Sequence, residues 1–120
     1  MKSHKDLEVW QVAVDLAVSV YAVTRKFPKD ELFGMSAQMR RSAVSIPSNI
    51  AEGAARNGKK EFIQFLYISL GSASELDTQL EIAQRVGLGE SPELQQLNDL
   101  RARVSKMIQG LIRSVKAPKS

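Results

Sequence analysis

Four stretches of the sequence repeat apolar residues at intervals of three and four, and short breaks separate them. This spacing lines up apolar side chains on one face of an α-helix, so it predicts four amphipathic helices. They cover about Leu7–Lys26, a stretch that begins within 30–35 and ends near Arg56, Lys59–Val86, and a stretch that opens at Ser91. Long helices joined by short turns are typical of an antiparallel, up-down-up-down bundle. The predicted fold class is therefore an all-α four-helix bundle.

Local signals set the expected helix ends. Side-chain oxygens cap the first turn of a helix, whereas proline stops a helix and glycine follows its last turn. The signals are Asp6 and Ser91 as N-caps, Pro92 in the first turn of the fourth helix, Phe27-Pro28 as a stop, Asn57-Gly58 as a turn, and Gly87 followed by Leu88 as a C-terminus.

The apolar stripes predict the core. The first stripe is Leu7, Trp10, Val14, Ala17 and Tyr21, the third is Phe62, Phe65, Leu66, Ser69, Ala73, Leu76, Leu80 and Ala83, and the fourth is Leu97, Leu100, Val104, Met107 and Leu111. Six further apolar residues broaden the first helix: Val9, Val12, Ala13, Leu16, Val20 and Val23. So broad an apolar surface is typical of a helix with contacts on two sides, which favours a neighbouring subunit on one of them.

The second helix contains a proline, Pro47, at its centre. Unrolled at 100° per residue, the helix has a core face and an opposite polar face. The core face carries Met39, Ala43, Ile46, Ile50, Gly53 and Ala54, the polar face carries Arg41, Ser45, Ser48, Glu52, Arg56 and Lys59, and Ser42 and Asn49 lie at the border. A proline inside a helix removes one backbone hydrogen bond and costs about 3 kcal/mol. We expect a kink with a polar partner from Ser42, Ser48 or Asn49, which is either a packing feature only or shapes an oligomer contact or a polar groove.

The length of 120 residues corresponds to one domain, expected over residues 6–116 with flexible tails at 1–5 and 117–120. The chain has no cysteine, which excludes disulfides and thiolate metal sites. The polar stretch "MKSHKDLEVW" lacks the apolar region of a signal peptide, so no secretory leader is expected. The longest apolar run, Val12–Val23, is interrupted by Asp15 and Ser19 and is too short to span a bilayer. We expect a cytoplasmic protein without a membrane contact.

Catalysis is not expected. His4 is the single histidine and lies in a polar tail, so neither a catalytic pair nor a transition-metal site is indicated. The glycines at 87 and 89 lack the lysine of a phosphate loop. Glu52 and Arg56 are spaced for an i,i+4 ion pair, and Glu75, Asp77 and Glu81 for a solvated face or for partners of basic neighbours. We predict no enzyme activity, no cofactor, no metal and no small-molecule substrate.

The net charge of +4 is segregated along the chain. Residues 61–100 hold one basic and seven acidic side chains, and residues 101–120 hold six basic and none acidic. Such segregation indicates either a basic surface for a polyanion or oppositely charged helices packed side by side. The candidate phosphate contacts are Arg40, Arg41, Arg56, Lys59 and Lys60, followed by Arg101, Arg103, Lys106, Arg113 and Lys116. Arg40 and Arg41 have a structural alternative, which is to pair with the acidic third helix.

The stretch "RRSAVSIPSNIAEG" closely resembles the signature of the 23S rRNA intervening-sequence proteins. The stretches "DLEVWQVAVDLAVSVYAVT", "FPKDELFGMSAQMRRS" and "FLYISLGSASELDTQLEIA" are similar to the same family, so the resemblance covers about Asp6–Leu88. It implies a four-helix bundle that assembles into a ring-like homopentamer. The family is related to the accessory protein of diversity-generating retroelements, a basic pentamer that binds nucleic acid. The resemblance implies no catalytic residues.

Two functions remain open at this stage. One is a non-enzymatic, oligomeric protein that associates with RNA or DNA backbone through its basic residues, with affinity that falls with salt. The other is a homo-oligomeric protein-interaction scaffold without a nucleic-acid role. Base stacking is not favoured, because Trp10, Tyr21 and Tyr67 occupy helical positions suited to packing.

Overall fold

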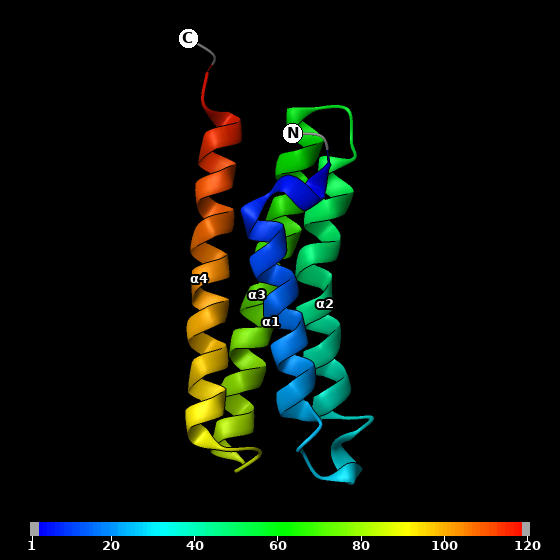
Figure 1. Cartoon of the computed structure of the whole chain (residues 1–120), viewed down its shortest axis with the longest axis vertical. Helices are drawn as coiled ribbons and strands as arrows, with labels where there is room; N and C mark the ends of the chain where they lie inside the picture. Colours follow the sequence, from blue (N-terminus) through cyan, green and yellow to red (C-terminus); the bar gives the residue numbers. More distant parts are fainter. Residues whose placement is uncertain (1–2, 119–120) are drawn as a thin grey trace.

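The computed structural model describes residues 3–118 and contains four long helices, with no strand among these residues. They are α1 (Glu8–Thr24), α2 (Met35–Ala54), α3 (Lys59–Arg85) and α4 (Ser91–Lys116), and short 3-10 helices at His4–Asp6 and Lys29–Glu31 precede α1 and α2. Consecutive helices run in opposite directions along a rod of 52 × 21 × 19 Å (Figure 1). The predicted up-down-up-down bundle is confirmed.

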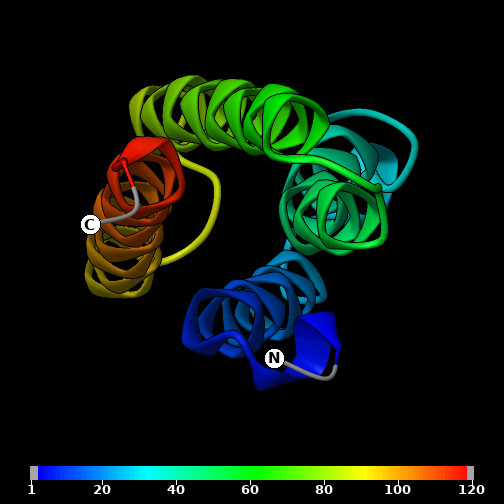
Figure 2. The ribbon, with the colours of Figure 1, turned by 90° about the horizontal axis from the view of Figure 1, so that it is seen from above.

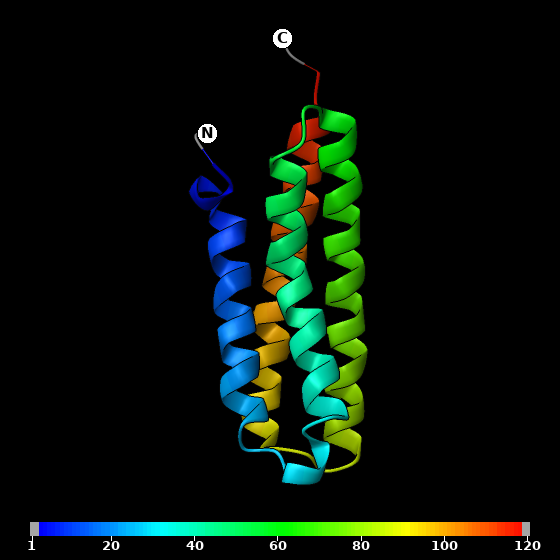
Figure 3. The same cartoon turned by 90° about the vertical axis from the view of Figure 1, so that its right-hand side faces the viewer.

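Each long helix packs on two neighbours. α1 and α3 both contact α2 and α4, and within residues 3–118 the diagonal pairs α1–α3 and α2–α4 have no Cα atoms within 8 Å of each other. Seen from above, the helices therefore stand at the corners of a square (Figure 2), and the side view shows α1 beside α2 along its whole length (Figure 3).

Two of the predicted helix caps are wrong. Asp6 does not cap α1, because its Oδ2 accepts from Ser3 N at 3.2 Å in the capping box of the preceding 3-10 helix, and Leu7 stands at the N-cap of α1. Ser91 lies within the first turn of α4, and Glu90 precedes it. The predicted tail therefore has a capped turn in its described part, while positions 1–2 and 119–120 lie outside the described residues.

The predicted C-terminus of α3 is confirmed. Gly87 has φ of 79°, a left-handed conformation that glycine adopts without strain. Leu88 N then donates to Ala83 O at 2.8 Å, and the Leu88 side chain packs against the core. This is the hydrogen-bond pattern of a Schellman motif, which turns the chain towards α4.

The core runs along the bundle axis, and α3 uses its predicted stripe from Leu66 to Ala83. On α1 the predicted stripe is correct only in part, since Ala17 is buried, whereas Tyr21 is exposed and Trp10 is half-buried. The six broadening residues are all buried. On α4 the buried residues are Leu94, Leu97, Val104, Ile108 and Ile112, while Leu100, Met107 and Leu111 are half-buried. A strict 3.5-residue seam drifts off a 3.6-residue helix, which moves the buried face of α4 by one position.

α2 and α3 approach each other closely where α2 ends beside the start of α3. A Cβ built on Gly53 would lie 2.7 Å from Phe65 Cβ and 3.0 Å from Phe62 Cδ1. Only a hydrogen fits at this position, so Gly53 is required by the approach of the two backbones. The predicted core face of α2 is confirmed, with Ala54 at its edge.

α2 continues through Pro47, whose ring is buried. Polar side chains gather around it: Asn49 Nδ2 donates to Ser45 O at 2.8 Å, and Ser45 Oγ lies 2.8 Å from Ser72 Oγ on α3. Ser69 Oγ, fully buried on α3, donates to Ile46 O at 2.9 Å. Of the three expected partners Asn49 makes such a contact, and the serines of α3 supply the others. The kink itself stays a prediction.

Charged side chains also tie helix ends together. Lys26 Nζ lies 2.7 Å from Glu93 Oε2, which links the end of α1 to the start of α4. The hydrogen bond to Glu93 and the negative charge of that carboxylate raise the pKa of Lys26 above its ordinary value. Across residues 3–118 no helix has the length and apolarity needed to cross a membrane.

Replacing Gly53 with alanine is expected to lower the free energy of unfolding by about 1–3 kcal/mol, because the added methyl group overlaps α3. Gly110→Ala is the matched control, since its Cβ would meet only the end of Arg113 at 3.7 Å. That change should raise the free energy by about 0.5–1 kcal/mol. Urea unfolding followed by circular dichroism measures both, and equal effects would contradict the close approach at Gly53.

Replacing Ser69 with alanine is expected to lower the free energy of unfolding by about 1 kcal/mol, because the buried hydrogen bond to Ile46 O is lost. Ser74→Ala, an exposed serine one turn further along α3, should change it by less than about 0.5 kcal/mol. The same urea titration reports both values. A neutral Ser69→Ala would show that the hydroxyl contributes nothing around Pro47.

Candidate functional site

The ten predicted phosphate contacts do not form one surface. Arg40 and Arg41 lie near the start of α2, whereas Arg56 follows its end, about 24 Å further along the bundle. Antiparallel packing then brings the end of α4 to the end of the bundle where α3 begins (Figure 1). The residues at this end are Arg56, Lys59, Lys60, Arg113 and Lys116. The middle of α4 carries Arg101, Arg103 and Lys106.

Four of these cations form what we call the end cluster: Lys59 and Lys60 in the first turn of α3, and Arg113 and Lys116 in the last turn of α4. All four are exposed, and within residues 3–118 none makes an ion pair. The end cluster therefore presents uncompensated positive charge to the solvent.

The fifth cation at this end, Arg56, is compensated. Its guanidinium lies 3.5 Å from Glu52 and 4.0 Å from Glu61, and it stands 5.1 Å from the centre of the Phe65 ring. The predicted Glu52–Arg56 ion pair is confirmed. Because two carboxylates share this arginine, it contributes less to the positive potential than the end cluster does.

Lys116 is held in position by an aromatic residue of α3. Its Nζ donates to Tyr67 Oη at 3.0 Å and lies 5.3 Å from the centre of the ring. The tyrosine keeps the ammonium charge intact, so Lys116 is oriented and still free to meet an anion. Tyr67 is half exposed.

The three cations in the middle of α4 have different surroundings. The Arg101 side chain is only 14% exposed, Nε donates to Asn98 at 2.9 Å, and the guanidinium lies 3.7 Å from Asp77 on α3. Arg103 lies 3.9 Å from Glu8 on α1, while Lys106 is exposed without an ion pair in the described chain. Arg101 therefore links two helices, and Lys106 is the available cation of this group.

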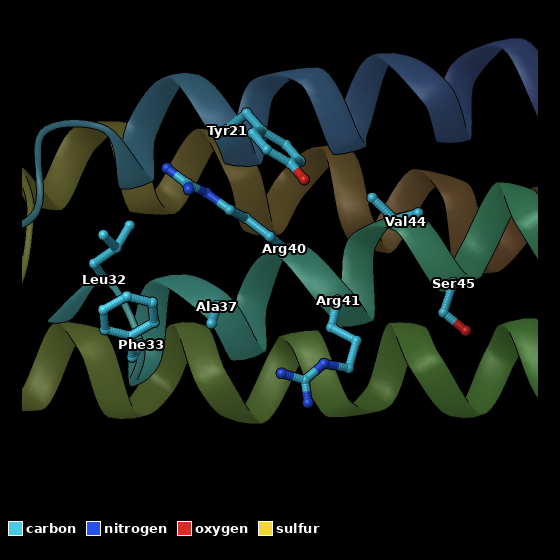
Figure 4. Close-up of a pocket in the computed structure, with 8 residues that line it drawn as sticks. All are labelled: Tyr21, Leu32, Phe33, Ala37, Arg40, Arg41, Val44 and Ser45. Atoms are coloured by element: carbon cyan, nitrogen blue, oxygen red, sulfur yellow. The ribbon is translucent and has the colours of Figure 1, made fainter.

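Arg40 turns to α1 rather than to acidic α3. Its Nε donates to Thr24 Oγ1 at 2.9 Å, and the guanidinium stands 4.7 Å from the centre of the Tyr21 ring (Figure 4). Arg41 is exposed, points to the α3 side in the same view, and lines a hollow with Glu75 and Gln79. Neither arginine makes an ion pair in the described part of the chain, so the predicted pairing with α3 is not formed.

A groove between α1 and α2 was not foreseen from the sequence. Near the 3-10 helix Lys29–Glu31 the groove opens into a hollow of about 670 Å³ beside Phe33, which is 92% exposed (Figure 4). Its apolar lining is Leu32, Phe33, Tyr21, Ala37, Val44, Val14, Ala17, Val18, Ala22 and Pro47, and its rim carries Arg25, Arg40 and Arg41. The breadth of the apolar surface on α1 was the available signal for this groove.

Candidate catalytic groups do not converge. His4 packs edge-on against Trp10, with ring centres 5.0 Å apart, and the serines near Pro47 bond to one another and to backbone. Over residues 3–118, no three histidine or carboxylate side chains come close enough to hold a metal ion.

The geometry defines an antiparallel four-helix bundle with a basic end and an open apolar groove. The family model of the 23S rRNA-intervening sequence proteins matches residues 5–110, and the chain belongs to this family. A crystal structure from Bacteroides thetaiotaomicron, described as a protein of unknown function from the S23 ribosomal protein family, has 25% sequence identity and a TM-score of 0.81. The match covers 88% of this chain and 95% of that one. No curated protein matches the chain.

Proposed function

We propose that the protein is a non-enzymatic homo-oligomer that associates with the backbone of RNA or DNA through the end cluster. The observation that carries this proposal is the meeting of four exposed cations, free of carboxylate partners in the described chain, at one end of the bundle. Lysine and arginine neutralise phosphates and release counterions, so affinity falls steeply with salt and carries little sequence information.

Assembly strengthens the same surface. One chain carries a net charge of +4, and a ring of five chains would carry about +20. Several end clusters on one particle bind a long phosphate backbone at several points, which raises the overall affinity without a new contact. This explains how a modest surplus per chain serves a polyanion.

The family name supports this choice of partner, since it refers to an intervening sequence of 23S ribosomal RNA. The exposed ring beside the end cluster, Tyr67, is occupied by Lys116 and offers the bases no free stacking surface. The proposed contact is therefore to phosphate, with the bases left unread.

A protein-interaction scaffold is the second candidate, and the groove is the observation that favours it. Its apolar side chains include Val18 at 64% exposure and Phe33 at 92%. Exposed apolar patches of this kind mark protein contacts. The scaffold and the nucleic-acid protein both use an oligomer, and they differ in whether polyanions bind.

The double substitution Lys59→Glu/Lys60→Glu tests the nucleic-acid proposal. We expect it to weaken binding of a random 20-nucleotide RNA, and the slope of log K against log salt to become shallower by about 1.4 or more, as for two lost phosphate contacts. Fluorescence anisotropy at several salt concentrations measures both quantities.

Lys29→Glu/Arg85→Glu is the matched control, because both residues are exposed at the opposite end of the bundle and the change in charge is the same. It should leave the salt slope nearly unchanged. Wild-type affinity that is weak and independent of salt would reject the nucleic-acid proposal and leave the scaffold.

A further inference from the structure

An uncovered stripe runs along the outer side of α3. Ile68 and Ile82 are 50% and 43% exposed, and Glu75 lies midway between them at a spacing of seven residues. Residues seven apart fall on nearly the same side of a helix, so these three form a line about 21 Å long. With Gly71 they make up what we call the α3 stripe.

No contact within its own chain requires a glycine at position 71. A Cβ built on it meets nothing within 4 Å, and its backbone is helical. Glycine inside an exposed helix costs about 0.5–1 kcal/mol relative to alanine. Beside two exposed isoleucines, a missing side chain gives a neighbouring surface room to approach α3 closely.

The groove and the α3 stripe stand at matching levels along the bundle. The contacts Ser45–Ser72 and Ile46–Ser69 show which residues of α2 and α3 lie at the same height along the bundle. Because the two helices are antiparallel, the residue numbers of such a pair have a nearly constant sum, here 115–117. Ile68 is then level with residues 47–49, Gly71 with 44–46, Glu75 with 40–42 and Ile82 with 33–35.

This alignment pairs apolar residues with apolar residues and a negative charge with positive charges. Ile68 stands at the level of Pro47 and Ile82 at the level of the start of α2, which the turn with Phe33 precedes, while the glycine stands at the level of Val44 and the single carboxylate at the level of Arg40 and Arg41. Glu75 makes no ion pair in the described chain. The groove and the stripe are thus complementary in both apolarity and charge.

We propose that the groove of one copy receives the α3 stripe of a second copy. The stripe lies on α3 and half of the groove lies on α1, and these two helices are diagonal in the bundle, so the stripe of one chain does not reach the α1 side of its own groove. Each copy then offers a groove to one neighbour and a stripe to another, which is a heterologous contact. Because the levels match without a shift along the bundle, copies packed in parallel repeat this contact without a rise, which is the condition for a closed ring.

The inference rests on the self-association part of the proposed function and names the surfaces that perform it. The absence of cysteine makes a cross-linking test clean. Val18 lines the middle of the groove, and Ile68 is level with Pro47 beside it. A disulfide needs Cα atoms within about 7 Å, which diagonal helices of one chain do not provide.

The chain Val18→Cys/Ile68→Cys is expected to form a ladder of covalent oligomers under mild oxidation on a non-reducing gel. The ladder should end in a closed species whose number of chains gives the ring size. Each single variant alone should stay monomeric on the gel, and mixing the two should give dimers. Val18→Cys/Lys106→Cys, with its second cysteine on exposed α4, is the matched control and should give no ladder.

A second variant separates assembly from folding. Val18→Asp should leave the helix content by circular dichroism unchanged, because the side chain is exposed, and reduce the native mass by light scattering to the 13.3 kDa of one chain. A wild-type protein that is monomeric at every concentration would overturn the proposal. So would Val18→Cys homodimers as abundant as the mixed dimers, since they indicate a symmetric groove-to-groove contact.

The two proposals fail in different ways. All assembly measurements are made without nucleic acid, so a ring that binds no RNA supports this contact and removes the nucleic-acid proposal. A monomer that binds RNA through the end cluster does the reverse. If Val18→Asp weakens RNA binding at unchanged native mass, the groove belongs to nucleic acid and the proposed contact between copies is wrong.

Discussion

The packing of α2 against α3 is the constraint on which the rest of the structure depends. At one end Gly53 lets the backbone of α2 meet Phe62 and Phe65, and near the middle Ser69 bonds to Ile46 O. These contacts fix the distance between the two helices and their relative level. A slide of one turn would place a side chain of α2 where only glycine fits, so the level is set sterically as well as by hydrogen bonds. The match between the groove and the α3 stripe follows from this fixed level.

Much of the fold could be predicted from the sequence, because helical periodicity and glycine and proline signals are local properties. The buried face of α3 from Leu66 to Ala83 and the turn at Gly87 were predicted correctly for this reason. The core face of α1 was wrong because the helix is apolar over most of its circumference, and periodicity does not say which arc meets the partners. Asp6 was misassigned because His4–Asp6 form a separate 3-10 helix, in which Asp6 completes the capping box of Ser3.

The site was harder to predict, since distance along the chain is a poor guide to distance in a long bundle. Arg41 and Arg56 belong to one basic segment of the sequence, yet α2 carries them to different ends. Arg113 and Lys116, distant in sequence from Lys59, lie at the same end because two antiparallel passes, α3 and α4, return the chain there (Figure 1). The groove depends on how α1 and α2 sit together, and the exposure of Phe33 is a property of that arrangement alone.

An even number of antiparallel passes has one further effect. The first described residues, before α1, and the last, after α4, both stand at the end of the bundle that holds the end cluster (Figure 1). A purification tag or a domain fused at either terminus would therefore lie close to the end cluster and reduce its access to a binding partner. The connection between α1 and α2 and the one between α3 and α4 face the other way, so an inserted label there leaves the basic end uncovered.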